Sequence, residues 1–343
     1  MSSEKLITIA KSMVQSGKGI LAADESNPTC TKRLEGIGVQ STFEKRNEYR
    51  DMLFTTPGIE EFISGVILYD ETLRQSTTCE KHIPFPEYLT SKGILPGIKV
   101  DTGAKTLAGF NNEKITEGLD NLHGRLEEYY KLGARFAKWR AVITIDDNIP
   151  SDACIFSNAH ALARYASLCQ EVGLVPIVEP EVLMEGNHTI ETCYEVTQRT
   201  HNIVFEQLLM HHVLLEGIVL KPNMIISALK CDTQAEPEKV ADMTFECLSK
   251  NVPNDVAGIA FLSGGQSSDL ACIHLNKMNQ LTTDLPWNLT YSYGRALQQS
   301  ALNTWLGKTE NVPAAQDAFL QRAKLNGLAS TGEYSESMEE VAI

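Results

Sequence analysis

Charged or polar side chains follow eight short apolar runs that are spaced along the whole chain. Each run is typical of a buried parallel strand, which is nearly continuous in apolar residues. A charge at the end of such a strand costs free energy unless it meets partners in a common site. Taken singly, each charge could equally begin a solvated loop, but as a set the charges favour one shared site. The run ends are Asp24, Asp70 with Glu71, Lys99 with Asp101, Lys138 with Arg140, Glu179 with Glu181, Lys221, Ser263 and Arg295.

Two neighbouring runs carry charges two residues apart, in the segments Ala-Lys-Trp-Arg-Ala and Val-Glu-Pro-Glu-Val. Side chains two residues apart point to the same face of a strand, so Lys138 and Arg140 share a face. Glu179 and Glu181 share a face for the same reason. If the two pairs face each other, their charges nearly cancel, which allows a dry site to hold all four. The alternative is that the glutamates only balance the two cations.

Lys221 ends the apolar run Gly-Ile-Val-Leu-Lys. Desolvation and a nearby second ammonium, that of Lys138, both favour the neutral amine. A neutral amine can attack a carbonyl and form an iminium ion, which then accepts electrons. A partly protonated carboxyl group would serve the proton transfers, so we expect a raised pKa for Glu179 or Glu181. Lys99 and Lys138 compete for the role of nucleophile, and Lys221 could instead extend from the rim of a barrel.

Two glycine-bearing segments, 262–267 and 293–296, each lead into a predicted helix. Backbone amides of such loops and helix N-termini attract anions, and Arg295 adds a bidentate partner. These segments therefore predict a phosphate site. A second cationic cluster is predicted from Lys99 and Arg140, with Lys32 and Arg33 after the first run. Two cationic clusters at opposite edges of one site suit a substrate with two phosphate groups.

The eight runs alternate with segments of helical periodicity, a pattern that predicts a parallel sheet. Eight units in one unbroken series predict an α/β protein with a single (β/α)8 barrel over residues 1–329, whose active site lies at the carboxyl ends of the strands. Residues 1–13 predict an N-terminal helical extension, and residues 330–343 a mobile acidic tail. The predicted strands are Gly19–Asp24, Ile63–Asp70, Leu95–Asp101, Phe136–Ile143, Leu174–Glu181, Gly217–Lys221, Gly258–Ser263 and Leu289–Gly294. The predicted helices include Ile115–Leu132, Asn158–Val172, His188–Leu214, Glu236–Asn251, Ser267–Asn279 and Arg295–Leu306.

The composition excludes several classes of partner. The 343 residues carry a formal net charge of −14, which argues against nucleic acid and anionic membrane surfaces. No apolar run reaches the ~18 residues of a membrane span, and the N-terminus has no signal-peptide core. The eight cysteines are scattered without a CxxC pair, as in a reduced, cytoplasmic protein. No histidines have metal-ligand spacing, so we expect neither a metal nor a cofactor.

Seven segments, in order along the chain, resemble the motifs of the class I fructose-bisphosphate aldolases. The resemblance extends from about residue 6 to residue 330, and its motifs are specific when taken together. The matching segments are GILAADES (19–26), GIKVD (97–101), FAKWR (136–140), VEPEVL (178–183), LKPNM (220–224), LSGGQS (262–267) and SYGRALQ (292–298).

The resemblance implies reversible cleavage of fructose 1,6-bisphosphate to dihydroxyacetone phosphate and glyceraldehyde 3-phosphate by a homotetramer. It implies that Lys221 forms a Schiff base at C2, with Glu179 as the acid and base in iminium formation. Asp24 would handle the proton of the C4 hydroxyl, Lys138 would stand beside the carbinolamine, and Glu181 would orient Lys138. The implied ligands of the C1 phosphate are Ser263, Gly264, Gly294 and Arg295, with Gly265 and Tyr293 beside them. Those of the C6 phosphate are Lys99 and Arg140, with Lys32 and Arg33. Ser26 is a further implied substrate-binding residue.

The C-terminus departs from many members of the family, which end in a tyrosine that assists proton transfer at C3. This chain ends in Glu-Glu-Val-Ala-Ile, and the nearest tail tyrosine is Tyr334. The short tail resembles that of bacterial members. The alternatives are another Schiff-base enzyme, of the transaldolase or deoxyribose-phosphate aldolase type, and a non-catalytic scaffold barrel. Two phosphate clusters favour a bisphosphate, and unused buried charges would destabilise a scaffold.

Overall fold

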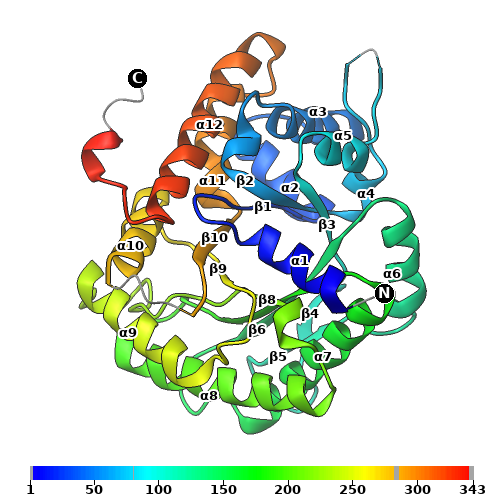
Figure 1. The fold of residues 1–343 in the computed structure, drawn as a ribbon. Helices are drawn as coiled ribbons and strands as arrows, with labels where there is room; N and C mark the ends of the chain where they lie inside the picture. Colours follow the sequence, from blue (N-terminus) through cyan, green and yellow to red (C-terminus); the bar gives the residue numbers. More distant parts are fainter. Residues whose placement is uncertain (1–2, 80, 282–285, 340–343) are drawn as a thin grey trace.

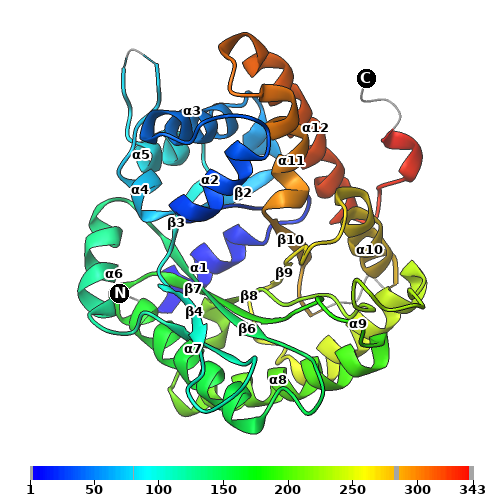
Figure 2. The same ribbon diagram turned by 180° about the vertical axis from the view of Figure 1, so that it is seen from behind.

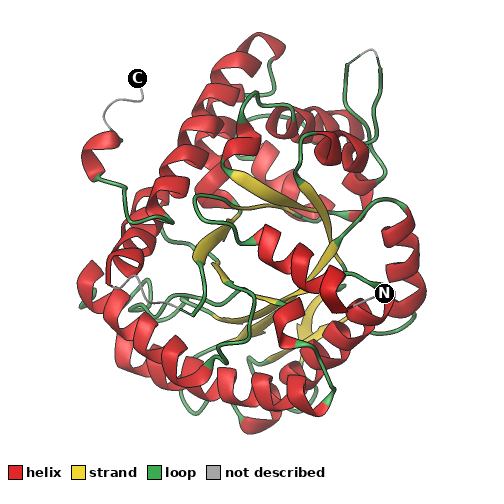
Figure 3. Cartoon of the chain, in the orientation of Figure 1, coloured by secondary structure: helices red, strands yellow, loops and turns green. Residues whose placement is uncertain are grey.

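A closed barrel of eight parallel strands forms the centre of the molecule (Figure 1, Figure 3). The computed structural model describes residues 3–79, 81–281 and 286–339. Strand order around the barrel is β1-β10-β9-β8-β7-β6-β3-β2. Each of the eight predicted runs supplies one strand, which confirms the predicted (β/α)8 fold. The strands are β1 Gly19–Ala23, β2 Ile63–Leu68, β3 Leu95–Lys99, β6 Phe136–Ile143, β7 Val175–Val182, β8 Val219–Leu220, β9 Ile259–Phe261 and β10 Leu289–Tyr293.

Helices surround the barrel and connect its strands (Figure 3). Two of the longest helices begin at a residue whose hydroxyl caps the first turn. The Ser151 hydroxyl accepts a hydrogen bond from the backbone amide of Cys154 at the start of α7, and the Thr189 hydroxyl accepts one from the backbone amide of Thr192 at the start of α8. Among the described residues, no helix is both long and apolar enough to cross a membrane. The α-helices are α2 Asn27–Glu35, α3 Phe43–Phe54, α4 Asp70–Leu73, α5 Phe85–Ser91, α6 Leu122–Lys131, α7 Asp152–Val172, α8 Ile190–Met210, α9 Pro237–Asn251, α10 Ser268–Leu281, α11 Arg295–Trp305 and α12 Val312–Ala329.

The N-terminal helix α1, Ser3–Met13, lies across the end of the barrel at which the strands begin (Figure 1). The carbonyl of Met13 accepts a 2.6 Å hydrogen bond from Ser64 Oγ at the start of β2. The apolar face of α1 packs in one buried cluster with side chains of the barrel interior, including Phe136 and Val175. The predicted helical extension thus closes this end, and the strands finish at the opposite end (Figure 2).

Phe136 fills the interior of the barrel next to a strand residue without a side chain. Gly97 of β3 is paired with Phe136 of β6. A Cβ atom at Gly97 would lie 2.1 Å from the aromatic ring, a distance that van der Waals contact does not allow. Glycine at this position therefore lets one large ring occupy the space of two side chains, as a close-packed core requires.

An antiparallel hairpin replaces the first part of the helix predicted over Ile115–Leu132. In this hairpin β4, Gly103–Thr106, pairs with β5, Lys114–Glu117, and α6 begins only at Leu122. Gly118 has a φ of 129° and Asn121 a φ of 55°, so the backbone turns between the hairpin and the helix. The prediction was wrong because apolar residues on both sides of these turns happen to follow a helical spacing.

The segment after α12 folds back against α10 and α12. The backbone amide of Tyr334 donates to Asn276 Oδ1 at 3.0 Å, and its ring is 5% exposed. Its hydroxyl donates to Glu339 Oε1 at 2.9 Å, while Arg322 of α12 binds both oxygens of Glu339 at 2.8 and 2.5 Å. The mobility of the tail stays a prediction, and its last residues, 340–343, lie outside the described residues.

We expect Tyr334→Phe to lower the free energy of unfolding by about 1 kcal/mol, because the buried hydroxyl no longer binds Glu339. Denaturant unfolding of the two proteins measures this difference. Tyr194→Phe is the control, since its hydroxyl meets Lys250 at 3.4 Å on the surface and is expected to matter by less than about 0.5 kcal/mol. Equal stability of Tyr334→Phe and the unmodified protein would show that the tail is not held by this contact.

Candidate active site

The carboxyl ends of the strands surround a cavity of about 440 Å³. It opens at the end of the barrel opposite α1, where the active site of this fold is expected. Most of the residues that the sequence nominated line this cavity. They are Asp24, Ser26, Arg33, Lys99, Lys138, Arg140, Glu179, Glu181, Lys221, Ser263, Gly264, Gly265, Gly294 and Arg295.

The structure does not bring Tyr293 and Lys32 to the cavity. The side chain of Tyr293 is fully buried behind β10, and its hydroxyl donates to the carbonyl of Ala271 at 3.2 Å. Its neighbour Ser292 lines the cavity instead, because successive side chains of a strand point to opposite faces. Lys32 is exposed on α2.

The acidic residues after β2 also turn away from the cavity. Asp70 and Glu71 begin α4, where Asp70 pairs with Arg74 at 3.0 Å and Glu71 with Arg46 at 2.7 Å. Tyr334 does not line the cavity either. The tail tyrosine is therefore not placed for proton transfer within it.

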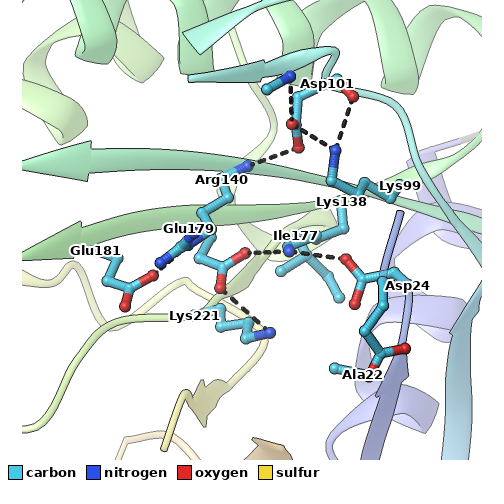
Figure 4. Close-up of polar contacts among 12 residues, drawn as sticks. Ala22, Asp24, Lys99, Asp101, Lys138, Arg140, Ile177, Glu179, Glu181 and Lys221 are labelled. Carbon is cyan, nitrogen blue, oxygen red and sulfur yellow. Dashed lines mark hydrogen bonds and ion pairs between the residues drawn. The ribbon is translucent and has the colours of Figure 1, made fainter. Parts of the chain in front are cut away.

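Four charged side chains form a continuous buried chain on the floor of the cavity (Figure 4). Lys138 Nζ lies 2.9 Å from Asp24 Oδ2 and 3.0 Å from Glu179 Oε2. The other oxygen of Glu179 lies 3.3 Å from Lys221 Nζ. The side chains of Glu179 and Lys221 are each 3% exposed, so their charges are compensated by one another rather than by water.

Lys221 has a lowered pKa. Burial is the largest cause, because it disfavours the charged ammonium, and the positive charge of Lys138 acts in the same direction. Glu179 and Asp24 oppose the shift without reversing it. The structure thus supports the predicted effect of desolvation and a second ammonium on this amine.

Glu179 does not have the raised pKa that the sequence suggested for one of the two glutamates. Burial alone would raise it, but Lys138, Lys221 and Arg140 together lower the pKa of this carboxyl group. The pKa of Asp24 is likewise held well below its usual range, with burial again opposed by Lys138 and Lys221. Both carboxylates are therefore ionised at neutral pH and are placed to accept protons.

Glu181 pairs with Arg140 rather than with Lys138. Adjacent strands explain this partner: Lys138 is level with Ile177 and Arg140 with Glu179 in the pairing of β6 and β7. Each cation reaches the carboxylate two residues further along β7, so Lys138 meets Glu179 and Arg140 meets Glu181. The implied orientation of Lys138 by Glu181 is not present in the structure.

The two glycine-bearing loops meet on one side of the cavity. Gly264 and Gly265 have φ angles of 53° and 94°, which favour glycine, and a Cβ at Gly264 would lie 2.0 Å from Met184 Cε. Gly294 precedes the first turn of α11. Arg295 Nη2 lies 3.6 Å from the position of a Cβ at Gly265, so the two loops and this guanidinium face one another. Backbone amides and a guanidinium in this arrangement suit a phosphate group.

Lys99 marks the other side of the cavity. Its ammonium donates to the carboxylate of Asp101 at 2.6 Å and to the backbone carbonyl of Asp101 at 2.9 Å. Ser26, the N-cap of α2, lies 3.2 Å from the hydroxyl of Thr29, and both line the cavity. Arg33, which the resemblance grouped with Lys99, lies instead beside Gly294: its Nη2 is 3.8 Å from the position of a Cβ there.

Glu25 was not predicted as a site residue, although it lines the cavity next to Asp24 and binds Arg33. Its charge was visible in the sequence, but nothing there indicated that it pairs with arginines from two helices. Among the described residues, no three His, Cys, Asp or Glu side chains are grouped to hold a metal ion. The independence of the reaction from metals stays a prediction.

A (β/α)8 barrel with a buried lysine beside a carboxylate at its mouth, flanked by anion-binding loops, is typical of the class I aldolases. A family model for class I fructose-bisphosphate aldolase matches residues 5–343. Over 335 residues the chain is 55% identical to a "Probable fructose-bisphosphate aldolase class 1" of Xanthomonas campestris pv. campestris, with 97% of this chain and 99% of the relative covered.

Two further comparisons agree. The "Fructose-bisphosphate aldolase 5, cytosolic" of Arabidopsis thaliana is 52% identical over 332 residues, covering 97% of this chain and 92% of the relative. A solved structure of fructose-bisphosphate aldolase from Plasmodium falciparum, in complex with TRAP and a small molecule inhibitor, superposes with a TM-score of 0.94. It is 50% identical and covers 97% of this chain and 95% of that chain. The chain therefore belongs to the class I fructose-bisphosphate aldolase family and is a lyase, rather than a transaldolase-type enzyme or a scaffold.

We expect Lys138→Met to move the acidic limb of the pH profile of kcat/KM to higher pH. The substitution removes a cation that lowers the pKa of Lys221 and leaves Asp24 and Glu179 to raise it, so less neutral amine is present at a given pH. Because kcat/KM reports the free enzyme, its pH profile measures this shift. We also expect kcat to fall about 100-fold or more.

Lys99→Met is the matched control for this experiment, since Lys99 also lines the cavity but is bound to Asp101. The acidic limb of the kcat/KM profile of Lys99→Met is expected to stay at the same pH as in the unmodified enzyme. A limb that moves equally in both variants, or in neither, would show that Lys138 does not set the charge state of Lys221.

Proposed function

We propose that Lys221 Nζ attacks the C2 carbonyl of fructose 1,6-bisphosphate and forms a Schiff base. The observation that carries this proposal is the burial of Lys221 with a lowered pKa, 3.3 Å from a carboxylate. Of the two lysines that contact Glu179, Lys138 has a raised pKa because Asp24 and Glu179 stabilise its ammonium against burial. Lys99, the other competitor, is engaged by Asp101. Lys221 is therefore the best candidate for a neutral amine.

Glu179 is the proposed acid and base of Schiff-base formation. As the C–N bond forms, the attacking nitrogen must lose a proton, and the ionised carboxylate 3.3 Å away can accept it. The carbonyl oxygen takes one proton from solvent and becomes the carbinolamine hydroxyl. The proton held by Glu179 then passes to this hydroxyl, which leaves as water and completes the iminium ion. Lys138, on the other oxygen of Glu179, holds the carboxylate in place and keeps a positive charge beside the oxygen that departs.

Asp24 is the proposed base for carbon–carbon cleavage. It takes the proton of the C4 hydroxyl, the C3–C4 bonding electrons move into the iminium ion, and glyceraldehyde 3-phosphate is released as the aldehyde. The remaining enamine is protonated at C3 and hydrolysed to dihydroxyacetone phosphate, which frees Lys221. The lowered pKa of Asp24 keeps it in the ionised form that this step needs. The steps are reversible, so the same groups also serve condensation.

The substrate is proposed to lie with a phosphate at each side of the cavity. Ser263, Gly264 and Gly265, together with Gly294 and Arg295, would bind the C1 phosphate through amides and a guanidinium. Lys99, Ser26 and Arg140 would bind the C6 phosphate on the other side. Two separate cationic ends support a bisphosphate over a substrate with one phosphate.

Lys221→Met is expected to reduce kcat for cleavage of fructose 1,6-bisphosphate by roughly three orders of magnitude or more, because the covalent path is lost. A coupled assay of triose phosphate release measures the rate. Lys99→Met, which removes another lysine from the same cavity, is expected mainly to raise KM. Retention of most of the activity by Lys221→Met would overturn the assignment of the nucleophile.

We further propose that the enzyme assembles as a homotetramer and works in the cytosol. An apolar patch on α7 and α8 supports assembly: Phe156, Leu209 and Met210 are 52%, 57% and 64% exposed. The ring of His160 stacks on Phe156 and contacts His211, which joins the two helices into one surface. Exposed apolar patches of this kind are typical of protein interfaces. The eight free cysteines and the name of the Arabidopsis relative, which calls that protein cytosolic, support the location.

Phe156→Asp combined with Met210→Asp is expected to lower the molar mass in solution, because charged side chains oppose burial in an interface. Light scattering coupled to size-exclusion chromatography measures the mass. Leu270→Asp on α10 serves as the control, since Leu270 is 37% exposed away from this patch. An unchanged mass of the double variant would place the subunit contacts elsewhere.

A further inference from the structure

Glu25, at the end of β1, holds one arginine on each of its two carboxylate oxygens. Oε1 accepts from Arg33 of α2, and Oε2 accepts from Arg50 Nη2 of α3 at 2.6 Å. The side chain of Glu25 is 5% exposed and that of Arg50 is 2% exposed. Two positive charges and one negative charge are thus packed together, which leaves this triad with a net charge of +1.

The two arginines of the triad have different surroundings. Arg33 lines the cavity, and its Nη2 lies 3.8 Å from the position of a Cβ at Gly294, in the loop proposed to bind the C1 phosphate. Arg50 does not line the cavity and lies behind Glu25, with its guanidinium 5.1 Å from the ring centre of Tyr49. The direct hydrogen bond of Arg50 within the triad is to Glu25, the partner that it shares with Arg33.

Gln298 fixes the position of Arg33 from a third direction. Its side-chain oxygen accepts from Arg33 Nη1 at 3.2 Å and from the hydroxyl of Tyr49 at 2.7 Å. Its amide nitrogen donates to the carbonyl of Ala22 at 2.7 Å, and the side chain is fully buried. Since Gln298 belongs to α11, the helix that follows Gly294, Arg33 is held against the phosphate loop by the same helix that begins at this loop.

We propose that Arg50 is a positioning residue for phosphate binding. It neutralises Glu25, so that Arg33 presents a net positive charge to a phosphate beside Gly294 and Arg295. Without Arg50, the carboxylate of Glu25 would cancel the charge of Arg33, and the triad would change from +1 to zero. A charge lost close to a phosphate in a partly buried site weakens its binding strongly. This inference rests on the proposed placement of the C1 phosphate.

Arg50→Gln tests the proposal by removing the charge while keeping a polar side chain. We expect both KM for fructose 1,6-bisphosphate and the inhibition constant of inorganic phosphate to rise ~10-fold. We expect kcat to change by less than about two-fold, because Arg33 lies at the phosphate loop and not at the reacting lysine. Arg50→Lys, which keeps the charge, is expected to restore most of the affinity.

The double variant Glu25→Gln with Arg50→Gln separates charge from structure. It removes the charges of both residues and returns the triad to +1, carried by Arg33, so phosphate affinity is expected to return to within about two-fold of the unmodified enzyme. A merely structural role for Arg50 would leave the double variant as weak as Arg50→Gln or weaker, and this result would overturn the proposal. Should Arg50→Gln fail to fold, the phosphate affinity of the double variant is compared with that of the unmodified enzyme. A clearly weaker affinity of the double variant would still overturn the proposal.

Arg46→Gln provides the matched control on the same helix. Arg46 carries an equal charge on α3 but pairs with Glu71 at 2.7 Å and has no contact with Glu25. Its KM and phosphate inhibition constant are expected to stay unchanged, and a rise equal to that of Arg50→Gln would contradict the role of Glu25.

Calorimetric titration with inorganic phosphate measures the same affinities without turnover. Weak binding by the double variant with normal turnover of the unmodified enzyme would therefore reject this inference alone, whereas absence of turnover in the unmodified enzyme would reject the proposed function.

Discussion

The ammonium group of Lys138 lies between two buried carboxylates, 2.9 Å from Asp24 and 3.0 Å from Glu179. Each of these three groups would be costly to bury alone, and together with a protonated Lys221 they form a set whose charges sum to zero. Lys138 has two carboxylate partners that stabilise its ammonium, whereas Lys221 has one. The free-energy cost of burying a charged ammonium is therefore compensated less at Lys221, and its pKa is lowered. The reactivity of one lysine thus follows from how tightly the other is paired.

The barrel provides the dry surroundings that this balance requires. Lys138 comes from β6, Glu179 from β7, and Lys221 directly follows β8, so three neighbouring strands bring the charges together at one end. At the other end α1 covers the barrel, and the ring of Phe136 fills the interior where Gly97 has no side chain. Packed side chains therefore fill the barrel at this end, and the cavity lies at the carboxyl ends of the strands.

Much of this arrangement could be predicted from the sequence, because strand ends in a parallel barrel must converge. The pairs 138 and 140, and 179 and 181, lie two residues apart and were expected to share a face, as they do. The partners were harder to predict. Glu181 binds Arg140 because of the register between β6 and β7, which a single sequence does not reveal. The predicted cavity residue was Tyr293, whereas Ser292 points inward. Because successive side chains of a strand point to opposite faces, an error of one residue places the wrong side chain in the cavity.

Contacts between distant segments were not predictable at all. Glu25 meets Arg50 from a helix 25 residues later, and Gln298 completes the group from the far end of the chain. The hairpin of β4 and β5 was missed because turns at Gly118 and Asn121 interrupt an apparently helical pattern. These features depend on packing between elements, whereas the strand ends depend on the local alternation of apolar and charged residues.

In the proposed mechanism Lys221, and no other lysine that lines the cavity, forms the covalent intermediate. Incubation with dihydroxyacetone phosphate, reduction with borohydride and peptide mapping by mass spectrometry tests it most directly. We expect a single stable adduct on Lys221, with Lys99 and Lys138 unmodified. An adduct on either of those lysines, or no adduct in enzyme that cleaves fructose 1,6-bisphosphate, would contradict it.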